Sequence, residues 1–350
     1  MAERDVKLQQ LRALLEEREL DALLLARVSS FAWATCGAPS YVSTTGDVGE
    51  AQLLVTRDSA VVLTNNIEAP RLANELGLAA QGWQFEARAW TEPLSINVDR
   101  LACDVARAGA VDVSRDISRL RTTLGAEEIA RFTELGARCA EAMAVAVRTV
   151  KPGQSELAIA AAMAAALIER DVWPSVAQVA TDERVLAYRH VLPTAKQLAK
   201  YAFLSFCGRR DGLVCSMTRL IHFGPLPDEL RRRQDVAARV DTALLSATRP
   251  GARGRDAFAA AMRAYKDGGY PDEWRNHHQG GAAGYEPREW VATPTCDELI
   301  ADRQAFAWNP TVQGTKSEDT VILDGTLRVL TTMRDWPALE GGRPAILEVT

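Results

Sequence analysis

The chain has 350 residues, 47% of them hydrophobic, which is enough for two domains that each bury a sizeable core. A formal net charge of -5 and a pI near 5.6 leave no basic excess to neutralise phosphates, so no nucleic-acid partner is expected. The six scattered cysteines include no Cys-x-x-Cys pair, and we expect them to be reduced thiols.

The N-terminus is expected to begin with a helix and not with a secretion signal. Residues 8–19 place apolar side chains at helical spacing among charged ones, and no apolar core with a small-residue cleavage site is present. Nowhere in the sequence do eighteen apolar residues follow one another. We therefore expect a cytoplasmic protein that does not interact with membranes.

The first 120 residues are expected to form one α/β domain. Its predicted elements after the first helix are a buried strand at 21–25, a hairpin of strands at 51–56 and 59–64, and a helix at 67–76. A long helix over 126–150 then leads into a second domain, for which we expect residues 121–350.

A Pro-Gly junction occurs twice in the second domain. Pro152-Gly153 and Pro250-Gly251 each end one predicted helix and start another, since proline cannot continue the helical ladder and glycine takes the cap conformation. The repeat predicts two similar halves related by a pseudo-twofold axis, with strands of both halves around one central cleft.

Three later segments carry the residues that are candidates for catalysis or ligand binding. Residues 203–219 predict a strand, a tight turn at Arg210-Asp211-Gly212 and a second strand. Residues 276–287 read NHHQGGAAGYEP, and residues 306–322 contain FAWNP and, further on, GTKSEDTVI. Histidines, carboxylates and amides lie among glycines in these segments, so we expect them to converge on one polar site.

In the order and spacing of these segments the chain resembles the pita-bread superfamily of creatinase, prolidase and methionine aminopeptidase. Metal-dependent members bind two divalent ions through two aspartates eleven residues apart, one histidine and two glutamates. The resemblance extends over nearly the whole chain. It implies an α/β (α+β) protein with a creatinase-like N-terminal domain and a C-terminal pita-bread domain, and it suggests a homodimer.

The resemblance also implies that most of the metal ligands are replaced in this chain. Ser205 and Ser216 stand at the two aspartate positions, and Asn309 stands at the first glutamate position. His278 and Glu318 match the remaining two ligands. Because one carboxylate and one imidazole cannot balance the four charges of two ions, we expect no bound metal and no other cofactor. The two serines and Asn309 are predicted to line the emptied pocket as substrate contacts.

A histidine at position 190 stands where the superfamily places one over the substrate, and creatinase itself works without metal through such a histidine and nearby carboxylates. His190 is therefore predicted to be the general acid and base, with Glu318 as its carboxylate partner. The resemblance implies a metal-independent hydrolase that cleaves a C-N bond in a small polar amide or amidino-type substrate.

Four further side chains are predicted to contact the substrate. His278 and Tyr285 are expected as substrate contacts or oxyanion donors. Lys316 shares a strand face with Glu318 if the segment is extended, and its charge would keep that carboxylate ionised. Arg288 is either a residue of a solvated turn or a clamp for a substrate carboxylate.

Three other interpretations stay open. Cys207 shares a strand face with Ser205 and could act as a thiol nucleophile assisted by a histidine. The chain could instead be a catalytically silent homologue that binds a ligand or a protein. It could also be an Xaa-Pro aminopeptidase or dipeptidase with one weakly bound metal, which elemental analysis would distinguish from the other two.

Overall fold

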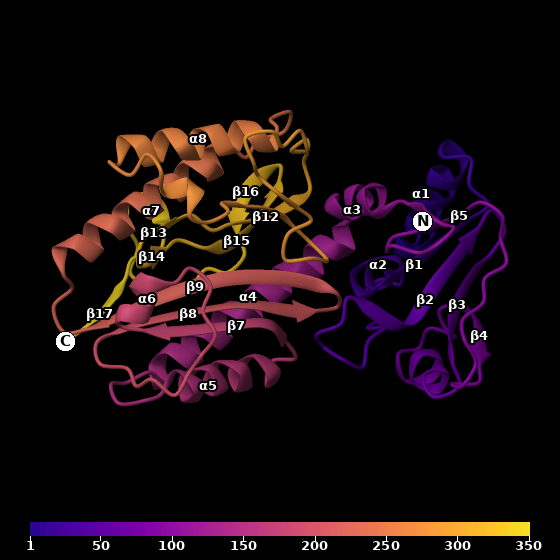
Figure 1. Ribbon diagram of the computed structural model, residues 1–350, viewed down its shortest axis with the longest axis horizontal. Coiled ribbons are helices and arrows are strands. Elements are labelled where there is room, and N and C mark those ends of the chain that lie inside the picture. Colours follow the sequence, from indigo (N-terminus) through magenta and orange to yellow (C-terminus); the bar gives the residue numbers. More distant parts are fainter. The chain divides into compact units, whose positions relative to one another are not determined.

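The structure is a computed structural model that describes residues 1–339 and 341–350 in full (Figure 1). It divides into two compact units, one formed by residues 1–127 and 211–213 and the other by the remaining residues. The boundary at 127/128 lies a few residues beyond the predicted one. No helix among the described residues has the length and apolarity needed to cross a bilayer.

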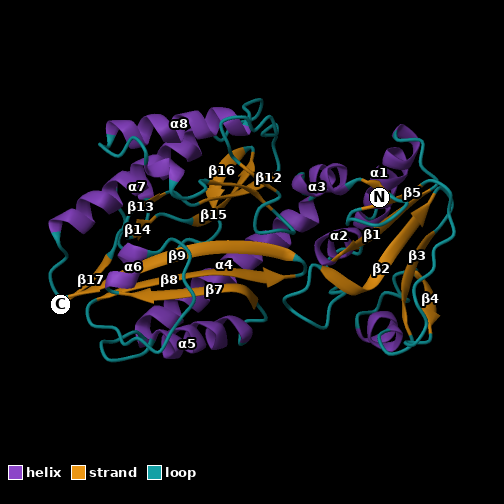
Figure 2. Cartoon of the chain, viewed as in Figure 1, coloured by secondary structure: helices purple, strands orange, loops and turns teal.

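The N-terminal unit is built on one mixed sheet of six strands in the order β4-β3-β2-β1-β5-β6 (Figure 2). Its strands are β1 (Ala22–Arg27), β2 (Val48–Thr56), β3 (Ala60–Asn65), β4 (Gln84–Arg88), β5 (Leu101–Cys103) and β6 (Val111–Asp112). Its helices are α1 (Glu3–Glu17), α2 (Val28–Ala34), η1 (Arg71–Glu75) and α3 (Ser114–Thr122). The predicted hairpin is confirmed, because β2 and β3 pair antiparallel with Val55 opposite Ala60.

The helix expected over 67–76 is shorter than predicted. Residues 69–75 are helical, and the last five of them, 71–75, have the wide π geometry. The Asn65 side-chain oxygen accepts the backbone N–H groups of Ile67 and Glu68 at 2.9 and 3.1 Å. This is the hydrogen-bond pattern of an N-cap, which satisfies N–H groups at the start of a helical segment.

The C-terminal unit consists of two halves that each contain a helix pair and a sheet, antiparallel throughout except where β17 pairs parallel with β9. The helices are α4 (Ala126–Thr149), α5 (Glu156–Ile168), α6 (Glu183–Ala187), α7 (Asp228–Ala247), α8 (Gly254–Asp267), η2 (Glu273–Arg275) and η3 (Glu340–Gly342). The strands are β7 (Trp173–Thr181), β8 (Tyr201–Arg210), β9 (Leu213–Phe223), β10 (Gly280–Ala283), β11 (Trp290–Val291), β12 (Gln304–Trp308), β13 (Thr311–Val312), β14 (Thr315–Lys316), β15 (Asp319–Asp324), β16 (Thr326–Val329) and β17 (Leu347–Val349).

The two sheets of this unit run in the orders β17-β9-β8-β7 and β11-β10-β12-β15-β16, and Figure 1 shows α5 and α8 on opposite sides of them. The Pro-Gly junctions precede α5 and α8 respectively. Gly153 and Gly251 both have a φ of +87°, a left-handed conformation that glycine adopts without steric cost. The repeated junction therefore starts the second helix of each half, as its sequence predicts.

Candidate functional site

The strands β8 and β9 and the residues before β15 bring the first and third motifs together. Ser205 lies on β8, Thr218 lies on β9, and Glu318 directly precedes β15. The Thr218 N–H donates to the Glu318 carbonyl oxygen at 3.2 Å, which joins β9 to the start of β15. The side chains of Ser205, Thr218 and Glu318 are consequently buried against one another.

The Glu318 carboxylate is the centre of this group and is only 3% exposed. Lys316 Nζ lies 2.7 Å from Oε2, and an Arg288 guanidinium nitrogen lies 3.0 Å from Oε1. The hydroxyls of Thr218 and Ser205 also donate to Oε2, at 2.6 and 3.3 Å. Arg288 is therefore not a residue of a solvated turn, since its charge faces a buried carboxylate.

The two cations keep Glu318 ionised. Burial by itself raises the pKa of Glu318, but the charges of Lys316 and Arg288, together with hydrogen bonds from Lys316 and Thr218, lower it to about 2. A carboxylate in this state does not accept a proton near neutral pH. With two positive charges and one negative charge, the group retains a net charge of about +1.

The dinuclear metal site that the superfamily resemblance implies does not fit these residues. Both oxygens of Glu318 already bind cationic side chains, and the other expected ligand positions hold the neutral Ser205, Ser216 and Asn309. The Ser216 hydroxyl accepts a hydrogen bond from Arg288 at 3.3 Å, so it also faces a cation. Two divalent ions would meet one anionic ligand and two positive charges, which opposes their binding.

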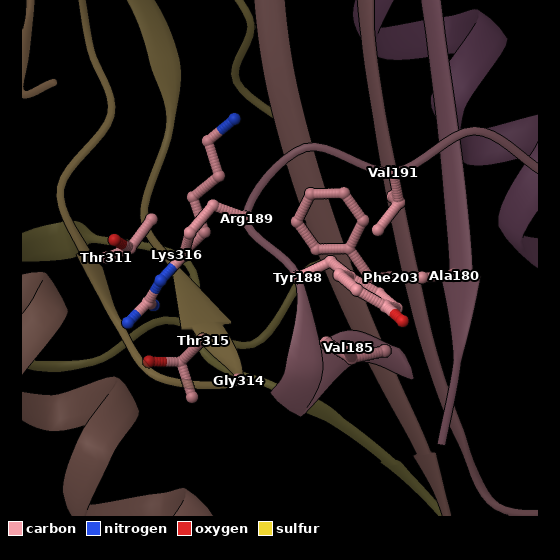
Figure 3. A pocket seen from close by; sticks show the side chains of 10 residues that line it. All are labelled: Ala180, Val185, Tyr188, Arg189, Val191, Phe203, Thr311, Gly314, Thr315 and Lys316. Carbon is pink, nitrogen blue, oxygen red and sulfur yellow. The ribbon is translucent and has the colours of Figure 1, made fainter. Parts of the chain in front are cut away.

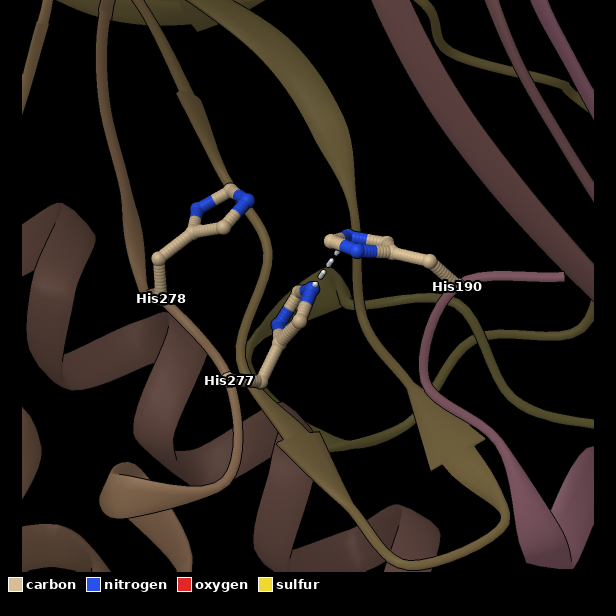
Figure 4. A group of neighbouring side chains, drawn as sticks. All are labelled: His190, His277 and His278. Carbon is tan, nitrogen blue, oxygen red and sulfur yellow. Dashed lines mark hydrogen bonds between the residues drawn. The ribbon is translucent and has the colours of Figure 1, made fainter.

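Three histidines converge beside this group (Figure 4). His190 comes from the irregular segment between α6 and β8, whereas His277 and His278 lie between η2 and β10. The Nε2 atoms of His190 and His277 are 3.1 Å apart, and the rings of His277 and His278 stack with centroids at 4.5 Å. The structure thus joins His190 to His277, and no hydrogen bond among the described residues joins it to Glu318.

The segment that carries His190 is held by two buried or partly buried carboxylates. Glu156 is fully buried and accepts hydrogen bonds from the backbone and hydroxyl of Thr194 at 2.9 and 2.7 Å. Arg189 pairs with Glu273 of η2, four residues before His277. The sequence analysis did not single out these carboxylates. The available signal was Glu156, three residues after Gly153 of the Pro-Gly turn, in an otherwise apolar helix.

Tyr285 and Cys207 do not take the roles considered for them. Tyr285 is 2% exposed and its hydroxyl donates to Glu128 Oε1 at 2.7 Å, so its single proton is not available to an oxyanion. Burial, together with the charge of Glu318, raises the pKa of Cys207, whose sulfur lies 3.2 Å from the Ser216 hydroxyl. A thiolate nucleophile is therefore disfavoured at this position.

A small pocket borders the Lys316 stem between β7, β8 and the turn around Gly314 (Figure 3). Its volume of about 20 Å³ holds about one water molecule. Arg189 and Lys316 both line it, and the Lys316 side chain extends away from Gly314. The pocket is too small for a substrate. It borders the site around Glu318 only through Lys316, which lines it.

Burial and the neighbouring cations keep the histidines uncharged. Burial and the charge of Lys316 lower the pKa of His277 to about 2, and burial and Arg288 lower that of His278 to about 4. Burial and Lys316 also lower the pKa of His190. All three rings are therefore neutral at pH 7. One of the two Nε2 atoms of His190 and His277 donates to the other, and His278 Nδ1 accepts the Gly280 N–H at 3.3 Å.

This arrangement predicts loss of stability in mild acid. The unfolded chain takes up protons on these histidines below about pH 6.5, whereas the folded protein does not, so the free energy of unfolding falls as the pH drops from about 6.5 toward 4. The slope is up to about 1.4 kcal/mol per pH unit for His277, and it is smaller for the more exposed His278. Urea unfolding at several pH values measures it.

His277→Gln is expected to flatten this pH dependence. The matched control is His222→Gln, because His222 lies outside the cluster and its Nδ1 contacts the Gly224 carbonyl at 3.0 Å. If both variants kept the wild-type slope between pH 6.5 and 4.5, the neutral state of His277 would not be the cause.

Comparison with known proteins gives a family match and several similar folds. The profile described as "Metallopeptidase family M24" matches residues 130–326. A search of curated protein sequences returns no match. The prolidase from Pyrococcus horikoshii OT3 superposes with a TM-score of 0.80 at 16% identity, covering 94% of this chain and 98% of that chain.

Two other solved structures extend this comparison. The Xaa-Pro dipeptidase from Bacillus anthracis has a TM-score of 0.78 at 16% identity and covers 99% of this chain and 100% of its own. The N-terminal domain of FACT complex subunit SPT16 from Cicer arietinum has a TM-score of 0.72 at 12% identity, with coverages of 95% and 96%. At such identities the likeness concerns the fold, and it confirms the expected pita-bread architecture.

Proposed function

Because this chain belongs to metallopeptidase family M24, we propose that it is a hydrolase of a C-N bond in which fixed cations replace the pair of metal ions. The observation that carries the proposal is the pairing of Glu318 with Lys316 and Arg288. In a site with little water, fixed positive charge stabilises an oxyanion that develops during attack on a carbonyl or amidino carbon. The net positive charge also favours a small polar substrate that carries a carboxylate.

His190 is the proposed general base and acid. Its neutral imidazole accepts a proton from water while the water oxygen bonds to the substrate carbon. The resulting imidazolium returns that proton to the nitrogen as the C-N bond breaks, so no proton remains on the protein. His277 Nε2, at 3.1 Å, orients the ring in place of the carboxylate expected from the sequence.

Substrate contacts follow from the same group of residues. We propose that His278 and Asn309 contact the substrate, because His278 lies beside His190 with ring centroids 5.9 Å apart, and the buried Asn309 Oδ1 has no hydrogen-bond partner among the described residues. Ser205 and Ser216 hold the cations of the site.

We also propose that the protein is cytoplasmic and forms a homodimer. Sedimentation velocity would test the homodimer.

The proposed function predicts turnover that survives metal removal. The protein, treated with a chelator, is tested for amine or ammonia release from guanidino, ureido and dipeptide compounds that carry a carboxylate. Turnover is expected to be unchanged by the chelator. Loss of turnover on chelation, with recovery on adding two equivalents of Mn²⁺ or Co²⁺, would contradict the proposal.

A second candidate is a ligand-binding protein without catalysis. It is favoured by the four donors on Glu318, three on Oε2 and one on Oε1, which leave that carboxylate little acceptor capacity for a reaction. A compound from the same panel that raises the thermal midpoint but is not cleaved would support this candidate over the hydrolase.

A further inference from the structure

The histidine cluster has a ligand geometry of its own, which the proposed hydrolysis does not require. We propose that His190, His277 and His278 form a binding site for one divalent transition-metal ion such as Zn²⁺. This set shares only His278 with the five ligands that the superfamily resemblance implies. The proposal concerns binding alone and does not depend on the proposed function.

The distances between the ring nitrogens suit one tetrahedral ion. Zinc binds imidazole nitrogen at about 2.0–2.1 Å, so two nitrogens of a tetrahedral site lie about 3.3 Å apart. The Nε2 atoms of His190 and His277 are 3.1 Å apart, and the ligand atoms of all three histidines lie within 4.8 Å of one another. Small side-chain rotations therefore close the remaining gap to His278.

Two structural features allow and guide that closure. His190 is exposed on a segment without regular secondary structure, so its ring can rotate without disturbing a helix or strand. The ion pair between Arg189 and Glu273 joins the chain next to His190 to the turn that precedes His277. The rings are thus brought together before a metal binds, which reduces the entropic cost of binding.

The chemistry of the three rings also suits a metal. Neutral imidazole is the form that binds metal. The hydrogen bond between the two Nε2 atoms holds one proton, so metal binding requires the donor ring to shift that proton to its Nδ1. Three histidines leave a fourth tetrahedral position open, as in catalytic zinc sites. A bound ion and proton transfer by His190 exclude each other, because both use its lone pair.

Neighbouring groups limit the affinity. The Lys316 charge, which already lowers the pKa values of His190 and His277, also repels a divalent ion. The buried Nδ1 of His277 has no hydrogen-bond partner among the described residues, and a missing outer partner typically costs about 10–100-fold in metal affinity. We therefore expect binding in the micromolar range.

Titration of the chelator-treated protein with Co²⁺ and Zn²⁺ tests the site. We expect one equivalent by calorimetry and the visible absorption bands of tetrahedral Co²⁺. His190→Ala and His277→Gln should each weaken metal binding by more than about 100-fold. This exceeds the loss of affinity caused by removing a hydrogen-bond partner of a metal ligand. Lys316→Met should bind several-fold more tightly, because it removes the repelling charge.

His222→Gln is the matched control, since His222 is the one histidine outside the cluster and should keep wild-type binding. Circular dichroism of each variant checks the fold, and His190→Ala is informative even if the more buried His277 variant unfolds. No binding by the wild type, equal binding by His190→Ala, loss of binding in His222→Gln, or a stoichiometry of two would each overturn the proposal.

Discussion

Replacing Glu318 by glutamine is expected to lower the free energy of unfolding by about 3–5 kcal/mol. The substitution keeps the shape of the side chain but removes the negative charge that Lys316 and Arg288 share at 2.7 and 3.0 Å. The buried Lys316 and the partly buried Arg288 would then face each other without a counter-ion. Urea denaturation monitored by tryptophan fluorescence measures the loss.

A double-mutant cycle separates this charge effect from a packing effect. Lys316→Met in the Glu318→Gln background should recover part of the lost stability, because it removes one of the two uncompensated charges. Glu183→Gln is the matched control, since Glu183 pairs with Lys196 at 3.1 Å on the surface and should change stability little. If Lys316→Met destabilised wild type and Glu318→Gln equally, the ammonium and carboxylate would not be energetically coupled.

Replacing His190 by glutamine is expected to lower kcat by about 10²–10⁴-fold on any substrate that the panel identifies. Glutamine retains hydrogen bonding to His277 but cannot take up the proton of the attacking water. KM should change much less than kcat, because the cations of Lys316 and Arg288 that attract the substrate remain in place. Steady-state kinetics of amine release measures both.

Substitution of His277, which is proposed to orient His190, gives a second value of kcat to compare with that of His190→Gln. His277→Asn should reduce kcat less than His190→Gln, because it misaligns the base without removing it. His222→Gln should leave kcat unchanged, since its ring contacts Gly224 and not the cluster. An unaltered kcat in His190→Gln would remove this residue from the reaction and favour the binding protein.

The buried network around Asp319 shows why Glu318 holds its position. Arg343 pairs with Asp319 at 2.9 Å and with Asp241 at 2.7 Å, and Arg219 pairs with Asp319 at 2.8 Å. All of these side chains are buried, so the start of β15 is tied to β9 and α7 by charges that have no access to water. The residue before Asp319 is thereby fixed beside Lys316.

Local rules of sequence determined several features correctly. Residue parity in an extended segment predicted that Lys316 neighbours Glu318, and the two lie in contact. The alternating strands around Arg57-Asp58 predicted the β2-β3 hairpin, and the Pro-Gly pairs predicted the helix starts. Each of these depends on backbone geometry within a few residues. That the metal ligands are replaced stays a prediction, made from residue identity at the positions that match the superfamily's motifs.

Only the tertiary structure decided which charged and polar groups meet. Arg288 reaches Glu318 from 30 residues away, and His277 meets His190 from 87 residues away. Tyr285, expected at the substrate, donates to Glu128 on α4. Such contacts depend on how the two sheets and their connecting segments pack, and side-chain periodicity along one segment carries no information about its partner in another. The sequence therefore placed Lys316 beside Glu318, and the packing of the two halves brought Arg288 to the same carboxylate.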